Sequence, residues 1–135
     1  MGEPRITVEK LRFNDTDMLG HINNTMYSVA LEAGRVELVK EAGLLDIARG
    51  HGVVIARIEL DFLREMNWPG EVRCETVVHK LGNKSFQLRQ HLVHAGEICA
   101  RAHTVLTTFD MATRKAVPLT EEWRAALERW YLPEF

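Results

Sequence analysis

The spacing of hydrophobic and polar residues changes along the chain and divides it into predicted strands and helices. Residues 5–13 roughly alternate, which predicts a first strand. From Asn24 to about Ala42 the apolar residues recur at helical spacing and cover most sides of the helix, so we expect it to be largely buried. Asn23 or Asn24 can cap the start of this helix, and Gly43 can end it.

Beyond Gly50 the chain is predicted to be mostly β structure. Four runs alternate between apolar and polar residues and are separated by turn signals: residues 53–63, 71–81, 85–94 and 97–109. The first run is expected to place five apolar side chains on one face: Val54, Ala56, Ile58, Leu60 and Phe62. A last amphipathic segment begins near Thr120 and predicts a short C-terminal helix. One long helix against a strongly curved antiparallel sheet of about five strands makes an α+β architecture.

Length and composition define the general class of protein. The 135 residues contain no repeat or Pro/Ser-rich linker, which predicts a single domain over residues 1–135. Their 46% hydrophobic and 27% charged residues are typical of a soluble globular protein. The formal net charge of -2 argues against nucleic acid or an anionic membrane as the main partner, because both recruit clustered positive charge.

The cysteine content and the N-terminus indicate the cellular compartment. The only two cysteines, Cys74 and Cys99, show no Cys-x-x-Cys spacing, which makes a disulfide framework and a thiolate zinc site both unexpected. The N-terminal segment lacks the apolar core of a signal peptide, and no stretch is long enough to span a bilayer. These features predict a cytoplasmic protein.

The segment RFNDTDMLGHINNTMY, residues 12–27, concentrates polar side chains where the long helix begins. Asp, Asn and Thr are common in turns and helix caps, so an ordinary helix entry is one interpretation. Asp15, Asp17 and His21 are metal ligands in kind, but calcium-loop spacing and a His-Glu-x-x-His segment are both absent, so we expect no metal. In a third interpretation, free N–H groups at the helix start hold an oxyanion while a nearby carboxylate acts as nucleophile or general base.

Other nucleophiles have less support in the sequence. No serine lies in a Gly-x-Ser-x-Gly segment, and neither cysteine has an activating neighbour along the chain. If the protein catalyses acyl transfer, the carboxylate is therefore the candidate.

The longer segment FNDTDMLGHINNTMYSVALEAGR resembles the hotdog-fold thioesterases of the 4-hydroxybenzoyl-CoA thioesterase group. Members of that group carry an Asp-x-Asp-x-x-Gly segment between the first strand and the central helix, and one subgroup continues with Gly-His-Val-Asn-Asn and a Tyr, which reads GHINNTMY here. The segments FLREMNWPGEV, LGNKSF and VLTTFD resemble further parts of the family in the same order, so the resemblance covers most of the chain. It implies a hotdog fold, in which a curved antiparallel sheet wraps one long central helix.

The resemblance also implies roles for residues at the helix entrance. Asp17 matches the catalytic carboxylate of the family, and the backbone N–H of Asn24 is the expected oxyanion donor. Relatives carry Tyr or His at the position of Asn24, and an Asn side chain cannot act as a general base, so the chemistry should depend on Asp17 alone. Asp15 and Asn23 are expected to support the loop and cap the helix. His21 is expected to orient the loop or the substrate, or simply to pack and hydrogen-bond.

A second set of residues matches positions that bind coenzyme A in the family. Lys84 and Ser85 correspond to positions near the phosphates and the pantetheine, and Arg114 and Lys115 could add charge-assisted hydrogen bonds. No cofactor is implied, since coenzyme A is part of the substrate. Hotdog relatives build their active site across a dimer, which implies a homodimer or homotetramer, and a long exposed sheet edge would favour such pairing.

The function predicted in this way is an acyl-CoA thioesterase that releases a free acid and coenzyme A. The alternatives are an acyl-thioester hydratase or dehydratase, and a non-catalytic acyl-thioester-binding module in which Asp17 serves only the cap. Another hotdog lineage uses a glutamate on the helix as its catalytic acid, which makes Glu32 and Glu37 of interest. Each is followed three residues later by a cation, Arg35 or Lys40, and this spacing predicts ion pairs.

Overall fold

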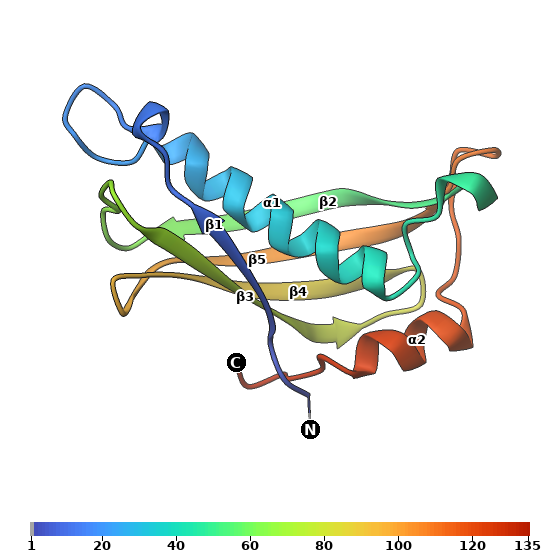
Figure 1. The fold of residues 1–135 in the computed structure, drawn as a ribbon. Helices are drawn as coiled ribbons and strands as arrows, with labels where there is room; N and C mark the ends of the chain where they lie inside the picture. Colours follow the sequence, from blue (N-terminus) through green and yellow to red (C-terminus); the bar gives the residue numbers. More distant parts are fainter. Residues whose placement is uncertain (1) are drawn as a thin grey trace.

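The computed structural model describes residues 2–135, and Figure 1 shows a long helix lying on one face of a curved sheet. The elements in chain order are β1 (Arg5–Lys10), η1 (Phe13–Asp15), α1 (Asn24–Glu41), η2 (Ile47–Arg49), β2 (His51–Phe62), β3 (Glu71–Leu81), β4 (Ser85–His94), β5 (Glu97–Asp110), β6 (Lys115–Ala116) and α2 (Glu121–Glu128). The predicted α+β order of strand, helix, four strands and terminal helix is confirmed. The short strand β6 was not predicted, because two residues carry no readable alternation.

The sheet is antiparallel throughout, with the strands in the order β1-β3-β4-β5-β2 and β6 paired to the end of β5. The strands β1 and β2 therefore form its two edges. The edge strand β2 is twelve residues long and pairs only with β5, so the backbone groups on its other side are unpaired along the described chain. An edge of this length is a template for pairing with another strand.

The helix α1 begins and ends at residues whose chemistry suits the two positions. The side chain of Asn23 caps the start by accepting a hydrogen bond from the backbone N–H of Thr25, and Gly43 follows the end with φ of 84°. Between these ends, α1 packs against β1, β3 and β4. It approaches the sheet so closely at Gly34 that a Cβ atom there would lie 2.7 Å from Sγ of Cys74.

The alternation predicted for β2 is wrong in its first half. A bulge leaves Ala56 without a partner, so that Ile55 lies opposite Leu106 while Arg57 already lies opposite Val105. The extra residue resets the alternation, and Val54 falls on the opposite face from Ile58.

The two predicted helix ion pairs are also wrong. Within residues 2–135, neither Glu32 with Arg35 nor Glu37 with Lys40 forms an ion pair. Arg35 instead turns towards the sheet and is buried there, while Glu37 and Lys40 are both exposed. For an exposed pair, hydration competes with the ion contact and leaves little net gain.

Candidate active site

The segment between η1 and α1, residues 16–23, is here named the entrance loop, and it is held by backbone hydrogen bonds. Thr16 pairs with Ile22 across the loop, and the N–H of Asp17 donates to the carbonyl oxygen of His21 at 2.7 Å. The loop is also tied to the segment after β2, because the N–H of Ile22 donates to the carbonyl oxygen of Met66 at 2.8 Å. These bonds fix the loop from both of its sides.

The carboxylate of Asp17 is oriented by this loop. Its Oδ1 atom accepts hydrogen bonds from the backbone N–H of Leu19 at 2.8 Å and of His21 at 3.2 Å. Its Oδ2 atom accepts none from the residues that the structure describes, and the side chain is half-buried. One carboxylate oxygen is thus held in place, while the other is available to accept a proton or to attack an electrophile.

Asp15 is placed quite differently from Asp17. It is 5% exposed, and both of its oxygens are engaged by Arg12: the backbone N–H lies 2.8 Å from Oδ2 and Nη2 lies 3.0 Å from Oδ1. Burial raises the pKa of Asp15, but the hydrogen bonds and the charge of Arg12 lower it by more, so the pKa lies below its ordinary value. Its carbonyl oxygen also accepts from the N–H of Asn23, which connects η1 to the start of α1.

The start of α1 presents a free backbone donor. Asn23 is the N-cap, and Asn24 is the first helical residue. Among residues 2–135 no acceptor lies against the backbone N–H of Asn24, and its side chain is exposed. A free N–H at the positive end of a helix is suited to hold a developing oxyanion.

His21 is engaged with the segment after β2 rather than with Asp17. Its Nε2 atom lies 3.1 Å from a carboxylate oxygen of Glu65, and its backbone pairs with Asn67. The imidazole ring therefore connects two surface segments that border the entrance loop.

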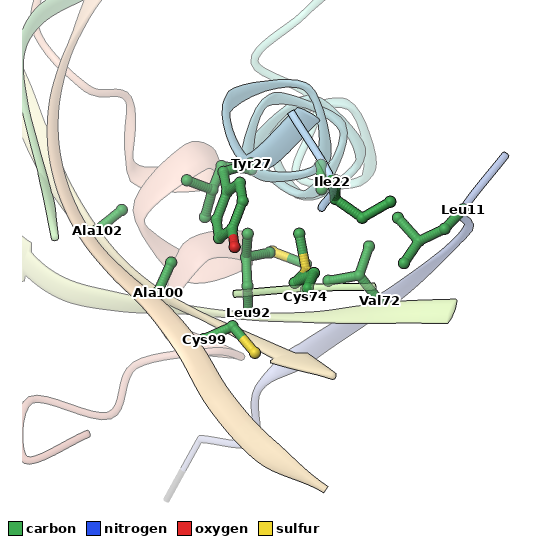
Figure 2. Close-up of a cluster of buried hydrophobic side chains, with 12 residues drawn as sticks. Leu11, Ile22, Tyr27, Val72, Cys74, Leu92, Cys99, Ala100 and Ala102 are labelled. Atoms are coloured by element: carbon green, nitrogen blue, oxygen red, sulfur yellow. The ribbon is translucent and has the colours of Figure 1, made fainter. Parts of the chain in front are cut away.

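Tyr27 belongs to the same sequence segment and fills the space beneath the helix start. It is buried, its hydroxyl donates to the carbonyl oxygen of Arg64 at 2.7 Å, and its ring packs edge-to-face on Phe62 at 5.1 Å. Figure 2 shows this ring between α1 and the sheet, next to Leu92 and Ala100. Burial raises the pKa of the Tyr27 hydroxyl, so the group stays a neutral donor.

The residues expected to bind coenzyme A lie together at one end of the sheet. Lys84 is exposed in the turn before β4, and Ser85 begins that strand. Lys115 lies opposite Asp110 in the β5–β6 turn, and Arg114 is exposed in the same turn. The two turns are connected, because the carbonyl oxygen of Lys84 accepts from the N–H of Thr108 at 3.1 Å.

Within one chain these residues are not brought to Asp17. The entrance loop contacts the segment between β2 and β3, at the end of the sheet opposite the β3–β4 and β5–β6 turns (Figure 1). The ten-residue strand β4 runs between the two ends, and ten strand residues span about 30 Å. The predicted catalytic residues and the predicted coenzyme A residues therefore lie at opposite ends of the sheet within a single subunit.

His94 supports the site but was not selected from the sequence. Its Nδ1 atom lies 2.9 Å from the carbonyl oxygen of Glu71, and its Nε2 atom accepts from the backbone N–H of Asn67 at 3.3 Å. His94 thus holds the segment that the entrance loop contacts. It ends a strand before a turn, where the alternation of side chains gives no signal for such a contact.

Comparisons with known proteins agree with this fold. The family model of the Thioesterase-like superfamily matches residues 11–127. A predicted thioesterase from Bacillus stearothermophilus is 31% identical, with 96% of this chain and 97% of that one covered, and superposes with a TM-score of 0.88. A thioesterase from Thermus thermophilus, solved with coenzyme A and Zn, is 28% identical, with 93% and 98% covered and a TM-score of 0.83.

One further relative is the uncharacterized protein YsmA of Bacillus subtilis (strain 168). It is 28% identical over 120 residues, which are 87% of this chain and 80% of that protein. The chain belongs to the thioesterase-like superfamily and is a thioester hydrolase with the hotdog fold.

The described residues contain neither a metal-binding cluster nor a membrane-spanning helix. Over residues 2–135, no three His, Cys, Asp or Glu side chains gather in a way that could hold a metal ion. No helix in the same range is long and apolar enough to cross a membrane.

Proposed function

We propose that this thioester hydrolase acts on acyl-CoA, with Asp17 as the nucleophile or general base. The observation that carries the proposal is the pair of hydrogen bonds from Leu19 and His21 to one oxygen of Asp17, which leaves the other oxygen free. Attack on the thioester carbonyl, by activated water or by Asp17 itself, forms a tetrahedral oxyanion. Its collapse breaks the C–S bond, and coenzyme A leaves as the thiol; a covalent Asp17 intermediate would then be hydrolysed to the acid.

The start of α1 would stabilise the charge that develops on the carbonyl oxygen. The unpaired N–H of Asn24 and the positive end of the helix dipole supply this stabilisation. The Asn24 side chain can neither accept nor release a proton at neutral pH, so proton transfer falls to Asp17. Asp15, Asn23 and His21 would act through the loop, by holding its backbone.

A homodimer would complete the site. Pairing β2 with the partner's β2 in antiparallel fashion satisfies the unpaired edge and obeys a two-fold axis. The end of β2 at Phe62, near the entrance loop, then lies beside the partner's His51, which is adjacent to Asp110 and the β5–β6 turn. Lys84, Ser85, Arg114 and Lys115 of the partner subunit would thereby reach the coenzyme A of this subunit. Two such dimers could form a homotetramer.

The cytosol is the compartment that we propose for this activity. Both cysteines, Cys74 and Cys99, are free thiols in buried positions, as expected in a reducing environment. Acyl-CoA is the partner proposed for the site, and neither nucleic acid nor a membrane is part of the proposal.

Thiol release from a panel of acyl-CoAs, measured with a thiol-reactive dye, tests the reaction. We expect the Asp17→Asn protein to keep its fold and to lose at least about a hundredfold in kcat, as for the loss of a base or nucleophile. Near-normal turnover by a folded Asp17→Asn protein would refute the role of the carboxylate. Tight binding of acyl-CoA without thiol release by the wild type would instead identify a binding module.

A further inference from the structure

Arg35 is a charged side chain buried beneath α1 without a carboxylate to pair with. It is 6% exposed, and within the described part of the chain its single hydrogen bond runs from Nη1 to Oε1 of Gln90 at 3.3 Å. Among residues 2–135 no carboxylate lies within ion-pairing distance of its guanidinium. Burial lowers the pKa of Arg35, although an arginine still keeps its proton in a protein. A buried cation with one neutral partner is costly and calls for a further acceptor.

The orientation of Gln90 shows on which side of α1 this cation lies. The Gln90 Nε2 atom donates to Oγ1 of Thr76 at 3.0 Å and lies 3.3 Å from Sγ of Cys74, and both of these residues belong to β3. The oxygen and the nitrogen of an amide diverge from the carbon that carries both, so Oε1 points away from Thr76 and Cys74. The Oε1 end and Arg35 are therefore on the other side of β4, over β5, where Ala102 is the register partner of Gln90.

The guanidinium is not sealed from solvent. In the described residues, three fully buried side-chain atoms lack a hydrogen-bond partner: Nε of Arg5, Oγ1 of Thr7 and Oγ1 of Thr104. The unpaired nitrogens of Arg35 are not among them, so they still reach the surface. Donors that are mostly buried but keep some accessible surface can receive an acceptor from outside the chain.

The side of the sheet that Arg35 faces is not covered by the helix. Because α1 packs on β1, β3 and β4, three inner-facing side chains of β2 stay about half exposed, Ile55 46%, Ile58 45% and Phe62 50%, while Leu60 between the last two is partly buried against the core. These three residues are here named the uncovered strip. Beside it, β5 presents the small side chains of Ala100 and Ala102 towards the helix (Figure 2).

The uncovered strip connects the helix start to Arg35. Phe62 packs against Tyr27, near the start of α1. From Tyr27 the helix rises about 12 Å to Arg35, at 1.5 Å per residue. Along the sheet, Leu60 of β2 lies opposite Ala102, which lies opposite Gln90, so the row that contains the partner of Arg35 crosses β2 between Ile58 and Phe62. An extended apolar chain that starts at the helix entrance and follows the strip would therefore pass the row where the guanidinium is bound.

We propose that the uncovered strip receives an acyl group whose far end carries a carboxylate, and that Arg35 binds that carboxylate. The inference rests on the proposed function, since it places the thioester at the start of α1. The methylene groups would lie against Ile58 and Phe62, and the carboxylate would accept hydrogen bonds from the free nitrogens of Arg35 and compensate its charge. The substrate class is then a medium-chain α,ω-dicarboxylic acid joined to coenzyme A at one end.

The test compares matched pairs of acyl-CoAs that differ only at the far end. Octanoyl-, decanoyl- and dodecanoyl-CoA are measured beside suberoyl-, sebacoyl- and dodecanedioyl-CoA. Within each pair, kcat/KM of the dicarboxylic substrate is divided by kcat/KM of the monocarboxylic one. The ratio cancels any effect on the reacting end. We expect the wild type to favour the carboxylate by at least about tenfold for one length, as for a charge-assisted hydrogen bond. A preference for the methyl end at every length would overturn the proposal.

Two variants of Arg35 and one control locate the preference. Arg35→Met should bring the ratio to one or below, while Arg35→Lys should keep part of the preference, since it keeps the charge. Arg89 precedes Gln90 on β4, so its side chain lies on the opposite face of the sheet. Arg89→Met therefore removes a nearby cation and should leave the ratio unchanged. An unchanged ratio in folded Arg35→Met protein would overturn the role of Arg35.

The outcomes also separate this inference from the proposed function. If none of the acyl-CoAs releases thiol, the proposed function fails. If the two acyl-CoAs of every pair are hydrolysed equally well, only the inference about Arg35 fails. If Arg35→Met changes the oligomer in sedimentation but not the ratio, Arg35 serves a subunit interface instead, and the inference is again refuted. The wild-type ratio decides the question even where the Met variant does not fold.

Discussion

The Nε2 atom of His94 accepts a hydrogen bond from the backbone N–H of Asn67, while Nδ1 lies 2.9 Å from the carbonyl oxygen of Glu71. A carbonyl oxygen only accepts, so Nδ1 is the donor in its contact with Glu71. This ring joins the end of β4 to the segment after β2. That segment in turn pairs with His21, whose backbone N–H donates to Asp17.

Replacing His94 should therefore disturb catalysis from a distance. We expect His94→Leu to lower kcat about tenfold and to cost about 1–3 kcal/mol, for two lost hydrogen bonds. His94→Gln offers an oxygen where Nε2 lies and should recover part of kcat. His103→Leu is the control, because among residues 2–135 the His103 ring hydrogen-bonds only to the side chain of Gln87 on the outer face, where it also packs on His79. Thioesterase kinetics and urea unfolding check both effects; equal kcat losses in His94→Leu and His103→Leu would contradict this role.

Asp15 should make the stability of the protein depend on pH in a predictable direction. Its pKa is lower in the folded state than in the unfolded chain, so its contribution is fully present above about pH 4, the unfolded value. The contribution is lost as pH falls through the lower, folded value. Asp15→Asn should therefore be less stable than the wild type at pH 7, and the difference should shrink in acid.

Urea unfolding of both proteins at pH 7 and in steps below pH 4 measures this difference. Asp46→Asn is a suitable control, because the Asp46 carboxylate caps the short η2 turn and pairs with the exposed Arg49, far from the entrance loop along the chain. A difference between Asp15→Asn and the wild type that stays constant at every pH would show that the carboxylate charge is not the cause.

Two buried threonines of β5 should respond in opposite ways to the same substitution. Both are 0% exposed, but the hydroxyl of Thr104 has no partner among the described residues, whereas that of Thr108 donates to the carbonyl oxygens of Lys84 and Val117. Thr104→Val should stabilise by about 1 kcal/mol, since it removes an unsatisfied polar group. Thr108→Val should destabilise by about 1–3 kcal/mol, since it leaves the carbonyl oxygen of Val117 without its hydroxyl donor. Thermal unfolding distinguishes the two, and a loss of stability in both would indicate that Thr104 has a partner in the assembled protein.

The sequence predicted local structure well, because local structure depends on spacing along the chain. This spacing predicts the start of the helix at Asn24, its end before Gly43 and the order of the strands along the chain. Contacts between distant residues could not. Arg35 follows Glu32 by three residues, and this spacing is typical of an exposed ion pair on a helix. Its observed partner, Gln90, lies fifty-five positions away.

Other differences have the same physical origin. The bulge at Ala56 inserts one small apolar residue into an apolar run, so the hydrophobic pattern before and after it looks continuous. His94 contacts backbone atoms, and backbone atoms carry no sequence signal. The separation of Asp17 from Lys84 follows from strand length and topology, which the matched motifs do not contain.

That separation leads to a test of the dimer proposed above. If each site combines Asp17 of one subunit with Lys84 and Arg114 of its partner, two defective proteins should restore activity when mixed. Asp17→Asn lacks the carboxylate, and the double variant Lys84→Ala with Arg114→Ala lacks the cations for coenzyme A. A hybrid dimer has one site with neither change and one site with both.

After mixed unfolding and refolding in equal amounts, half of the dimers should be hybrids, so about a quarter of all sites should be intact. At acyl-CoA concentrations below KM, thiol release should then exceed the mean of the two separate proteins. A mixture of Asp17→Asn with Asp17→Ala is the control and should show no gain. A site contained within one subunit predicts the simple mean instead, because unchanged Asp17 would always lie in a subunit that lacks the cations.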